Sequence, residues 1–332
     1  MLFSGIPRIR LIDGPTPLER LTRFGKACGH EHLYIKRDDV MSLGLGGNKV
    51  RNIEFWLGEA LAQKADVVVT AGGPFSSRSR LVASACAKIG IECHVLYGTD
   101  ELPDLNANYL LVSLTGAKCL CLGKVTEEER SALTRSYAEE LKKKGRRPYI
   151  AGLTIPGALG YVEAALELHA QAWQMDLDIR HIVVAGSMGP TEGGLLWGSA
   201  LLGGAFILHC PSVEFKADKL RSCVLDVCKG ISDRLEMEPS VPPERLLQVY
   251  GDFLGDGYDV PTEESVEAIR MLASLEGIFI ENTYNGKVFA ALATLLRSRI
   301  LPPDEGVCVV HTGGIPALFG QGERFAAPVR HS

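Results

Sequence analysis

Short apolar runs that alternate with helix-like segments constrain the fold of this chain more than any other sequence feature. The run 181–185 is almost wholly apolar and is followed by a glycine, which is typical of a strand buried on both faces of a parallel sheet. Similar strands are expected at 32–39, 67–70, 94–97, 118–122, 206–209, 277–280 and 307–310. Helices are expected after 49, over 77–89 and 103–114, and after 126. This alternation predicts an α/β protein with parallel sheets.

The composition is that of an ordinary globular protein. The chain has 332 residues, of which 46% are hydrophobic and 23% charged, with a net charge of −5. This length is sufficient for two domains. No lysine- or arginine-rich face dominates, so neither nucleic acid nor an anionic membrane is expected as a partner. The densest basic run, 142–147, falls where a helix should end and is interpreted as a solvated helix C-terminus.

Three further features narrow the class of protein. No stretch approaches the roughly 18 apolar residues that a membrane span needs. The N-terminal segment 1–10 lacks the apolar core of a signal peptide. The nine cysteines are scattered without metal-ligand spacing. They are interpreted as reduced thiols of a cytoplasmic protein, and no metal site is expected.

A glycine-rich turn at 46–49 delivers Lys49 to the start of a predicted helix. Glycines allow the backbone to approach a ligand closely. The dipole at the helix start and partial burial both disfavour the charged form of the amine, and an uncharged amine is a nucleophile. Such an amine can capture an aldehyde, and pyridoxal phosphate is the commonest one. The alternative interpretation is a surface lysine beside a glycine turn.

Three more glycine-rich turns follow predicted strands, where open parallel sheets bind their ligands. They lie at 72–73, 186–194 and 313–314. After the first of them, Ser76 and Ser77 are suited to cap a helix. Together with Arg78 and the free amides of the helix start, they are also suited to bind a carboxylate. The structural and the functional role are compatible.

The turn at 186–194 opens a predicted helix, and its successive amides are suited to a phosphate ester. Its spacing is not the G-x-G-x-x-G of dinucleotide sites, which argues against a nicotinamide dehydrogenase. Two of its residues weaken the phosphate assignment. Pro190 lacks an amide donor, and Glu192 places a negative charge at the start of the helix.

Two tyrosines and a threonine are further candidates. Tyr258 and Tyr284 each stand before a predicted helix, where a tyrosine is usually a packed amphipathic side chain. Thr312 ends the last predicted strand, where its hydroxyl could point into a site or simply belong to a strand-to-helix turn. Taken one at a time, none of the three indicates a function.

Together these segments resemble the D-cysteine desulfhydrase and 1-aminocyclopropane-1-carboxylate deaminase family, a branch of the tryptophan-synthase-β-like enzymes that use pyridoxal phosphate. The matching motifs occur in the same order over nearly the whole chain. They are 35–39, 46–49, 70–73, 261–264, 284–287 and 311–319. Several ordered motifs make this resemblance specific, whereas any one of them alone is weak.

The resemblance implies fold type II of the pyridoxal-phosphate enzymes, a two-domain, three-layer α/β/α architecture. A large cofactor-binding domain would comprise residues 1–51 and 162–332, and a smaller α/β domain would be inserted at 52–161. The cofactor, pyridoxal 5′-phosphate, would lie in the cleft between them. The resemblance also implies a homodimer that acts on a small amino acid.

Individual site residues carry over from the resemblance. Lys49 would bond to the cofactor and remove the α-proton, and Tyr258 and Tyr284 would be acid/base or leaving-group partners. Ser76 would position or protonate the substrate. The substrate carboxylate would be held by Ser76, Ser77 and Arg78. The cofactor would be contacted by Lys49, Asn52, Ser77, Gly186, Ser187, Met188, Gly189, Thr191, Asn285 and Thr312.

The residues expected at the pyridine nitrogen distinguish between the two activities of the family. Deaminases usually have a glutamate directly after the second tyrosine and a leucine near the C-terminal glycines. This chain has Asn285 and Thr312 at those positions. A carboxylate keeps the ring protonated, which makes it the strong electron sink that cyclopropane opening demands. Neutral partners give a weaker sink that suffices to expel a good leaving group, so desulfhydrase-like elimination is favoured.

The expected cofactor contacts depart from the family pattern in three places. The segment that usually reads V-Q-S-N-H is 74–78 here, so the asparagine expected at the ring hydroxyl is Ser77. The lysine expected near the phosphate is Asn52. The phosphate loop, usually G-S-G-G-T, is interrupted by Met188 and Pro190.

The leading hypothesis is a cytoplasmic lyase that uses pyridoxal phosphate to remove the α-proton and the β-substituent of a small amino acid, giving a keto acid and ammonia. A second hypothesis is β-replacement or another specialised biosynthetic reaction, for which Phe75 and Arg78 could shape the pocket. The deaminase activity is a further alternative. The altered cofactor contacts also suggest a former enzyme that is retained for binding or regulation.

Overall fold

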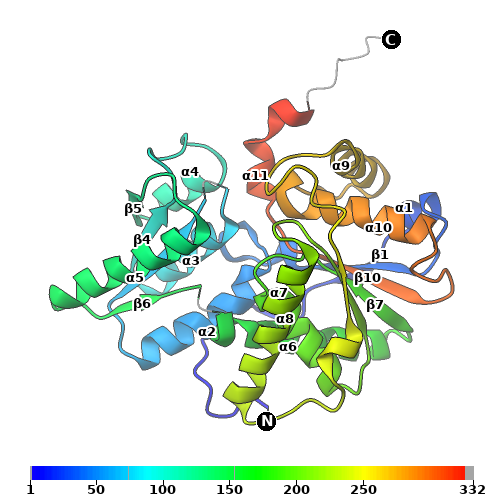
Figure 1. The fold of residues 1–332 in the computed structure, drawn as a ribbon, viewed down its shortest axis with the longest axis horizontal. Helices are drawn as coiled ribbons and strands as arrows, with labels where there is room; N and C mark the ends of the chain where they lie inside the picture. Colours follow the sequence, from blue (N-terminus) through cyan, green and yellow to red (C-terminus); the bar gives the residue numbers. More distant parts are fainter. Residues whose placement is uncertain (1, 74, 153, 326–332) are drawn as a thin grey trace. The chain divides into compact units, whose positions relative to one another are not determined.

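The computed structural model describes residues 2–73, 75–152 and 154–325, which divide into two compact units (Figure 1). Unit 1 comprises Met1–Gly14 and Met41–Gly160, and unit 2 comprises Pro15–Val40 and Tyr161–Ser332. The units thus divide after residues 14, 40 and 160. The domain boundaries expected from the sequence, after residues 51 and 161, stay a prediction.

Unit 1 is built on a four-stranded parallel sheet in the order β5-β4-β3-β6. Its strands are β3 (Val67–Gly72), β4 (Glu92–Tyr97), β5 (Lys118–Cys121) and β6 (Pro148–Ile150). Alternate residues of β3 face opposite sides, as the period of a strand requires. Val68 packs into the core with α2 (Lys49–Ala62) and α3 (Ser77–Ile89). Val67 and Val69 pack on the other side with Leu141.

Two helices of unit 1, α5 and α3, begin at capping residues that the sequence indicates. α5 (Glu127–Lys143) has a capping box, in which Thr126 and Glu129 bond to each other's backbone amides. α3 is capped by Ser76 and ends at Gly90, which is left-handed. α4 is shorter than predicted and runs over Ala107–Leu114.

Unit 2 is built on a six-stranded sheet in the order β1-β2-β10-β7-β8-β9. Its strands are β1 (Leu18–Arg20), β2 (Leu33–Arg37), β7 (Ile179–Val183), β8 (Ile207–Pro211), β9 (Leu247–Tyr250) and β10 (Gly306–His311). All pairs are parallel except β1 with β2. Both faces of a parallel sheet are covered by helices, which explains why every residue of β10, and every residue of β7 except Arg180, is buried. The prediction of an α/β fold with parallel sheets is confirmed.

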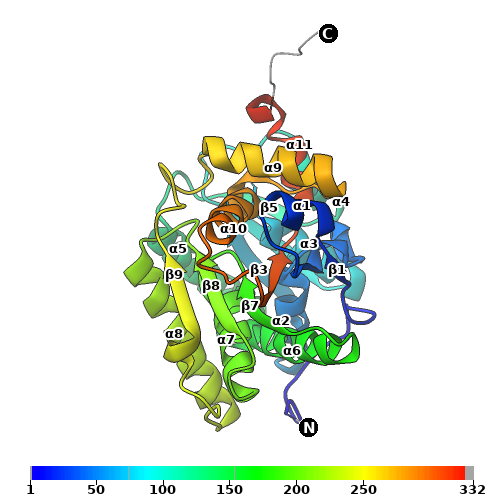
Figure 2. The ribbon, with the colours of Figure 1, turned by 90° about the vertical axis from the view of Figure 1, so that its right-hand side faces the viewer.

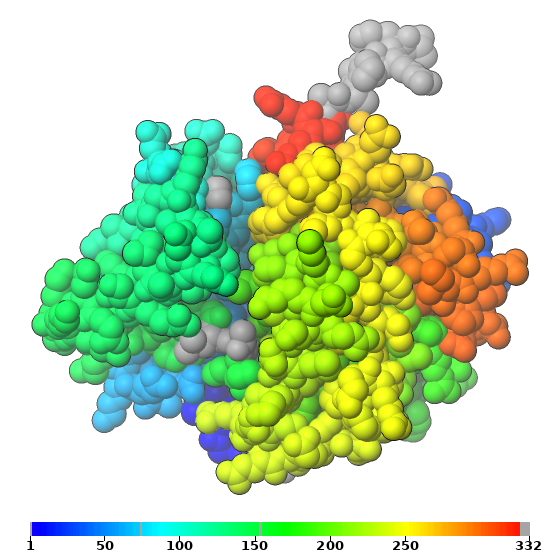
Figure 3. Space-filling view, in the orientation of Figure 1, coloured from blue at the N-terminus to red at the C-terminus, as the bar shows by residue number. Residues whose placement is uncertain are grey.

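Helices cover both faces of this sheet. They are α1 (Thr22–Ala27), the part of α6 (Thr154–Gln174) that lies in unit 2, α7 (Pro190–Leu201), α8 (Ala217–Leu235), α9 (Glu263–Glu276), α10 (Lys287–Arg297) and α11 (Ile315–Phe319). Figures 1 and 2 show α9 and α10 on one face and α7 and α8 on the other. The solvent side of α8 is visible in Figure 3. None of the described helices is long and apolar enough to cross a membrane.

One predicted strand is wrong. The segment 277–280 is not a strand, although Ile278 and Ile280 are both buried. In the sheet, β10 lies between β2 and β7, so neither of its edges can pair with a further strand. The apolar pattern of this segment therefore reflects core packing, and its carbonyl at Phe279 accepts a hydrogen bond from His311 Nε2 at 3.0 Å.

Buried polar side chains form a hydrogen-bonded chain across the sheet of unit 2. His181 Nε2 lies 2.6 Å from a carboxylate oxygen of Glu305, and His181 Nδ1 lies 2.9 Å from His209 Nε2. His209 Nδ1 in turn lies 2.8 Å from the hydroxyl of Tyr250. Burial, and then the neighbouring His181, lowers the pKa of His209 to about 3. His209 is therefore neutral in the folded protein at physiological pH.

We expect His209→Gln to make the protein less sensitive to acid. The folded pKa of about 3 lies below the unfolded value of about 6.5, so the associated stability is present above pH 6.5 and is lost as the pH falls toward 3. Between pH 7 and pH 5 this linkage amounts to about 2 kcal/mol. Urea unfolding at both pH values should show a correspondingly smaller loss in the variant. His32→Gln, which changes an exposed histidine, is the control, and equal losses in His209→Gln and the wild type would contradict the assignment.

Candidate active site

The turn that precedes Lys49 consists of four residues in left-handed backbone conformations. Gly44, Leu45, Gly46 and Gly47 have φ values of 53°, 65°, 69° and 129°. Leu45 is the strained member, since a non-glycine residue in this region costs about 1–3 kcal/mol unless its surroundings impose it. Lys49 then begins α2, so the predicted helix start is confirmed.

A buried arginine that the sequence motifs do not single out connects this turn to the turn before α3 that carries Ser76 and Ser77, here called the serine turn. Arg80 donates from Nη2 to the carbonyl of Gly46 at 3.0 Å and from Nε to Asn108 Oδ1 at 2.8 Å. Asn108 Nδ2 donates to the carbonyl of Phe75 at 2.9 Å. Desolvation lowers the pKa of Arg80 to about 10, so it stays charged at neutral pH. One guanidinium therefore positions both turns of unit 1 that carry candidate residues.

At the serine turn, the hydroxyls of Ser76 and Ser79 lie close to Gly72 at the start of α3. Ser76 Oγ accepts from the amide of Ser79 at 3.2 Å, which confirms its role as a helix cap. A Cβ atom on Gly72 would lie 2.5 Å from Ser76 Oγ and 2.8 Å from Ser79 Oγ, so only glycine fits beside them. The buried Ser79 Oγ has no hydrogen-bond partner among the described residues. Hydroxyls and a helix start in this arrangement are suited to a carboxylate.

Two other candidates of unit 1, Arg78 and Asn52, donate side-chain hydrogen bonds to backbone carbonyls of the same unit. Arg78 Nη2 donates to the carbonyl of Ala71 at 2.6 Å, so this end of the guanidinium closes the turn. Asn52 is fully buried, and its Nδ2 donates to the carbonyl of Gly157 at 2.9 Å. The remaining end of Asn52, Oδ1, accepts no hydrogen bond from the described residues. An oxygen acceptor is unsuited to a phosphate oxygen, which also accepts.

Tyr258 and Tyr284 form a hydrogen-bonded pair in unit 2. Their hydroxyl oxygens are 2.6 Å apart, and their rings meet edge to face. Tyr258 precedes α9, and Tyr284 belongs to the π-helical turn η4 (Asn282–Gly286). Although Tyr258 is 44% exposed as a residue, desolvation of its hydroxyl end is the main cause that raises its pKa, and burial raises that of Tyr284 as well. Both phenols are therefore protonated at neutral pH. Only one of the two hydroxyl protons forms the hydrogen bond that joins the tyrosines.

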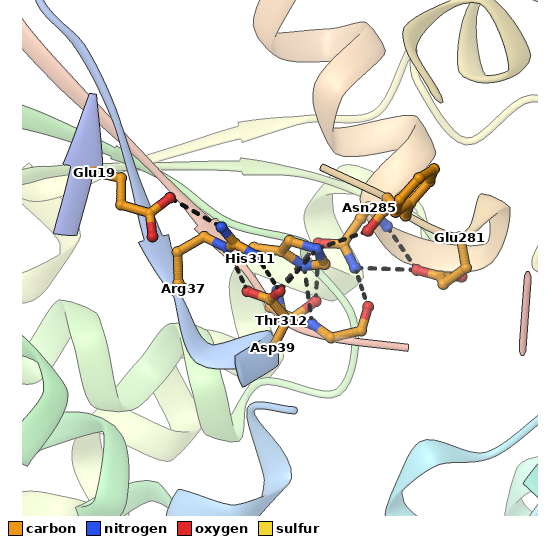
Figure 4. Close-up of polar contacts among 9 residues, drawn as sticks. Glu19, Arg37, Asp39, Glu281, Asn285, His311 and Thr312 are labelled. Carbon is orange, nitrogen blue, oxygen red and sulfur yellow. Dashed lines mark hydrogen bonds and ion pairs between the residues drawn. The ribbon is translucent and has the colours of Figure 1, made fainter. Parts of the chain in front are cut away.

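Asn285 and Thr312, expected together at the pyridine nitrogen, are in direct contact (Figure 4). Asn285 Oδ1 accepts from the amide of Thr312 at 3.1 Å and from its hydroxyl at 3.2 Å. Asn285 Nδ2 donates to Glu281 Oε1 at 3.1 Å and to the carbonyl of Gly313 at 2.9 Å. These four bonds determine the orientation of the amide, because a flipped amide would face donors with its NH₂ group.

Glu281 organises this turn, although the sequence motifs do not single it out. Its carboxylate accepts from the amides of Thr283 at 2.5 Å, Tyr284 at 3.1 Å and Asn285 at 2.9 Å. Burial raises its pKa, and these hydrogen bonds oppose the shift. A Cβ on Gly314 would lie 2.6 Å from Glu281 Cγ, so the glycine is required there. The available sequence signal was an acidic residue at the cap position of the turn.

The charged residues at the end of β2 support the end of β10 (Figure 4). Arg37 donates to both carboxylate oxygens of Asp39, at 2.9 and 2.8 Å, and to Glu19 at 2.9 Å. Asp39 lies 3.6 Å from the buried ring of His311, whose Nδ1 accepts from the amide of Gly313 at 3.1 Å. Burial lowers the pKa of His311, so the ring is neutral and holds the turn that follows it.

The turn at 186–191 follows β7 and leads into α7, as expected of an anion-binding turn. Gly189 is the helix cap with φ 97°, and Pro190 is the first helical residue. The amide of Ser187 donates to Glu192 Oε1 at 2.5 Å, and the Ser187 hydroxyl donates to the carboxylate of Glu214. The negative charge expected at this helix start therefore contacts the turn directly.

The structure brings the candidate residues together in two groups, one in each unit. Unit 1 holds Lys49, Asn52, Ser76, Ser77 and Arg78. Unit 2 holds Gly186, Ser187, Met188, Gly189, Thr191, Tyr258, Tyr284, Asn285 and Thr312. Their roles toward a cofactor or a substrate stay predictions. Arg80, Glu281 and Glu214 are the residues that tertiary contacts add.

A family model described as "Pyridoxal-phosphate dependent enzyme" matches residues 9–313. The chain therefore belongs to the family of pyridoxal-phosphate dependent enzymes, in agreement with its two-sheet α/β fold.

Among solved structures, an ACC deaminase homologue is similar to the whole chain, with 32% identity and a TM-score of 0.89 over 98% of this chain and 97% of that one. Threonine deaminase isoform 2 from Solanum lycopersicum is 15% identical with a TM-score of 0.67, covering 98% of this chain and 86% of its own. Diaminopropionate ammonia lyase from Escherichia coli is 16% identical with a TM-score of 0.66, covering 98% and 88%. At these low identities the last two similarities indicate a shared fold.

Pyridoxal 5′-phosphate is the cofactor that this family membership assigns. In unit 2, the neutral polar pair of Asn285 with Thr312 is suited to contact its ring. In unit 1, the buried Oδ1 of Asn52 accepts no hydrogen bond from the described residues. Lys49 stands at a helix start behind glycines, as a lysine that binds an aldehyde should. The phosphate turn fits less well, because a carboxylate already uses the amide of Ser187.

Proposed function

We propose that this protein is a lyase that acts on a small amino acid by α-proton abstraction and β-elimination, yielding a keto acid and ammonia, as in D-cysteine desulfhydrases. The observation that carries the proposal is the pair of protonated tyrosines, 2.6 Å apart between hydroxyls, on the same unit as the neutral pair of Asn285 and Thr312. The bound cofactor would supply the electron sink that acidifies the α-carbon.

The tyrosine pair is suited to assist a leaving group. Because both pKa values are raised, Tyr258 and Tyr284 are acids, not bases, at neutral pH. One hydroxyl proton lies between the two oxygens, and the second is available to the departing β-substituent. Lys49 is proposed to take the α-proton, and the hydroxyls of Ser76 and Ser77 are proposed to bind the substrate carboxylate together with Arg78.

The deaminase activity is the second candidate, because the ACC deaminase homologue is similar over the whole chain. The neutral side chains of Asn285 and Thr312 are the reason to rank it lower. The carboxylate of Glu281 lies behind Asn285 and is engaged by three backbone amides, so it does not replace a glutamate at position 285. β-Replacement uses the same first steps and differs only in the nucleophile that follows elimination.

Product analysis with a set of small amino acids tests the proposal. The purified protein, loaded with cofactor, is incubated with D-cysteine, L-cysteine, a β-chloroalanine and 1-aminocyclopropane-1-carboxylate, with and without an added thiol. Pyruvate and ammonia from a β-substituted amino acid, unchanged by the thiol, would support elimination. A thioether product would indicate replacement, and 2-oxobutyrate from the cyclopropane substrate would indicate the deaminase. Absence of turnover with all four would contradict the proposal.

The resemblance to the family predicts a homodimer, and the scattered cysteines predict a cytoplasmic location; we retain both as part of the proposal. The cytoplasmic assignment agrees with the cysteines, since all nine are free thiols. Burial raises the pKa of the Cys210, Cys228 and Cys308 thiols, which makes them unreactive core residues.

A further inference from the structure

The turn expected to hold the cofactor phosphate already contains an internal anion. The Glu192 carboxylate, on the first turn of α7, accepts from the amide of Ser187 at 2.5 Å. The side chain of Ser187 donates to a second carboxylate, that of Glu214. A phosphate ester would use the same kinds of donor, the backbone amides and hydroxyl of this turn. Pro190 has no amide to offer in compensation.

Backbone hydrogen bonds and packing hold the turn in place beside Glu192. Gly186 is hydrogen-bonded on both sides, to the carbonyl of Pro211 at 2.8 Å and from the amide of Val213 at 2.9 Å. A Cβ on Gly189 would lie 3.0 Å from the carbonyl of Cys223, so this residue is packed against α8. Glu192 is 2% exposed and has little solvent to turn toward. A phosphate therefore meets the carboxylate unless the side chain of Glu192 reorients.

The negative charges of the Glu192 carboxylate and of a phosphate bound to the same turn would repel each other strongly, because burial reduces screening by water. The helix dipole favours one anion at the start of α7, and Glu192 supplies it from within the chain. Glu214 adds a second charge near the same turn, and its field also contributes to the raised pKa of Tyr258 and Tyr284. A phosphate dianion thus competes with a carboxylate that the turn already stabilises. It therefore gains less binding free energy than it would at a turn without an internal carboxylate.

We propose that Glu192 is a built-in competitor of the cofactor phosphate and sets the affinity of this protein for pyridoxal phosphate. The phosphate then contributes little to binding, and the lysine and the ring contacts carry most of the affinity. This inference rests on the cofactor assignment and is independent of which reaction follows.

The test compares pyridoxal phosphate, pyridoxal and inorganic phosphate as ligands of the full-length protein without substrate. Dissociation constants from equilibrium dialysis are measured for the wild type and for Glu192→Gln, which keeps the shape and removes the charge. We expect the variant to bind pyridoxal phosphate at least tenfold more tightly, equivalent to about 1.4 kcal/mol, and pyridoxal equally well. Inorganic phosphate, which cannot bond to Lys49, should raise the melting temperature of the variant more than that of the wild type.

Two further variants complete the design. Glu267→Gln removes an exposed acidic residue of α9 and should change none of these quantities. Glu214→Gln removes the second carboxylate and decides the question if Glu192→Gln does not fold; it should also tighten pyridoxal phosphate selectively. Unchanged or weaker binding of pyridoxal phosphate in Glu192→Gln, or equal gains for pyridoxal, would overturn the proposal. Failure of the lyase assay would leave these binding results unaffected, so the two proposals fail separately.

Discussion

Replacing Lys49 by alanine is expected to abolish turnover and covalent attachment of the cofactor. The amine is proposed both to bond to the aldehyde and to take the α-proton, and loss of a general base alone lowers rates by about 10²- to 10⁴-fold. Steady-state assays should therefore show a loss of about 10³-fold or more. Borohydride treatment followed by peptide mass spectrometry should locate the reduced cofactor on Lys49 in the wild type and find no adduct in the variant.

The matched control is Lys88→Ala, which changes an exposed lysine in the last turn of α3 of the same unit. It should leave both the rate and the adduct unchanged. Turnover that survives in Lys49→Ala, or an adduct on a different lysine, would show that the glycine turn at 46–49 does not present the active amine.

Removing one hydroxyl of the tyrosine pair is expected to give the second largest effect. Tyr284→Phe should lower kcat by about 10²- to 10³-fold with little change in KM, because the hydroxyl is proposed to act on the leaving group after the substrate is bound. Tyr258→Phe should behave similarly. The double variant should lose little more than either single one, since the hydroxyls are 2.6 Å apart and share one proton network.

Tyr137→Phe is a suitable control, because it removes a hydroxyl that hydrogen-bonds to His94 at 3.0 Å in unit 1. The pH profile gives an independent check. The raised pKa values predict that the pair stays protonated well above neutral pH, so an alkaline decline in kcat that disappears in Tyr284→Phe should begin only above pH 10. Additive losses in the double variant would mean that the two hydroxyls act on separate steps.

Much of the secondary structure follows from local chemistry. The capping box at Thr126, the serine cap before α3 and the apolar run of β7 indicate their elements before any tertiary contact is known. The segment 277–280 shows where this reasoning fails. Three consecutive apolar side chains after a glycine can belong to a strand or to a coil, and the choice depends on whether a sheet edge is available.

The candidate site divides in the same way. Lys49 and Ser76 stand at helix starts, and helix starts can be recognised from glycines and hydroxyl side chains nearby. Arg80 and Glu281 could not be recognised, because their roles come from backbone groups far away or folded back onto them. A lone arginine in a helix and a lone glutamate before a turn are ordinary in sequence.

The sequence by itself determined the α/β class, the starts of α2, α3 and α5, and the family, because strand alternation, caps and ordered glycine turns are local patterns. Only the tertiary structure decided that the hydroxyls of Tyr258 and Tyr284 meet, that Asn285 turns its oxygen to Thr312, and that Glu192 contacts Ser187. The packing of helices on a sheet decides which side chains come within about 3 Å of each other. The spacing of residues along the chain does not encode that distance.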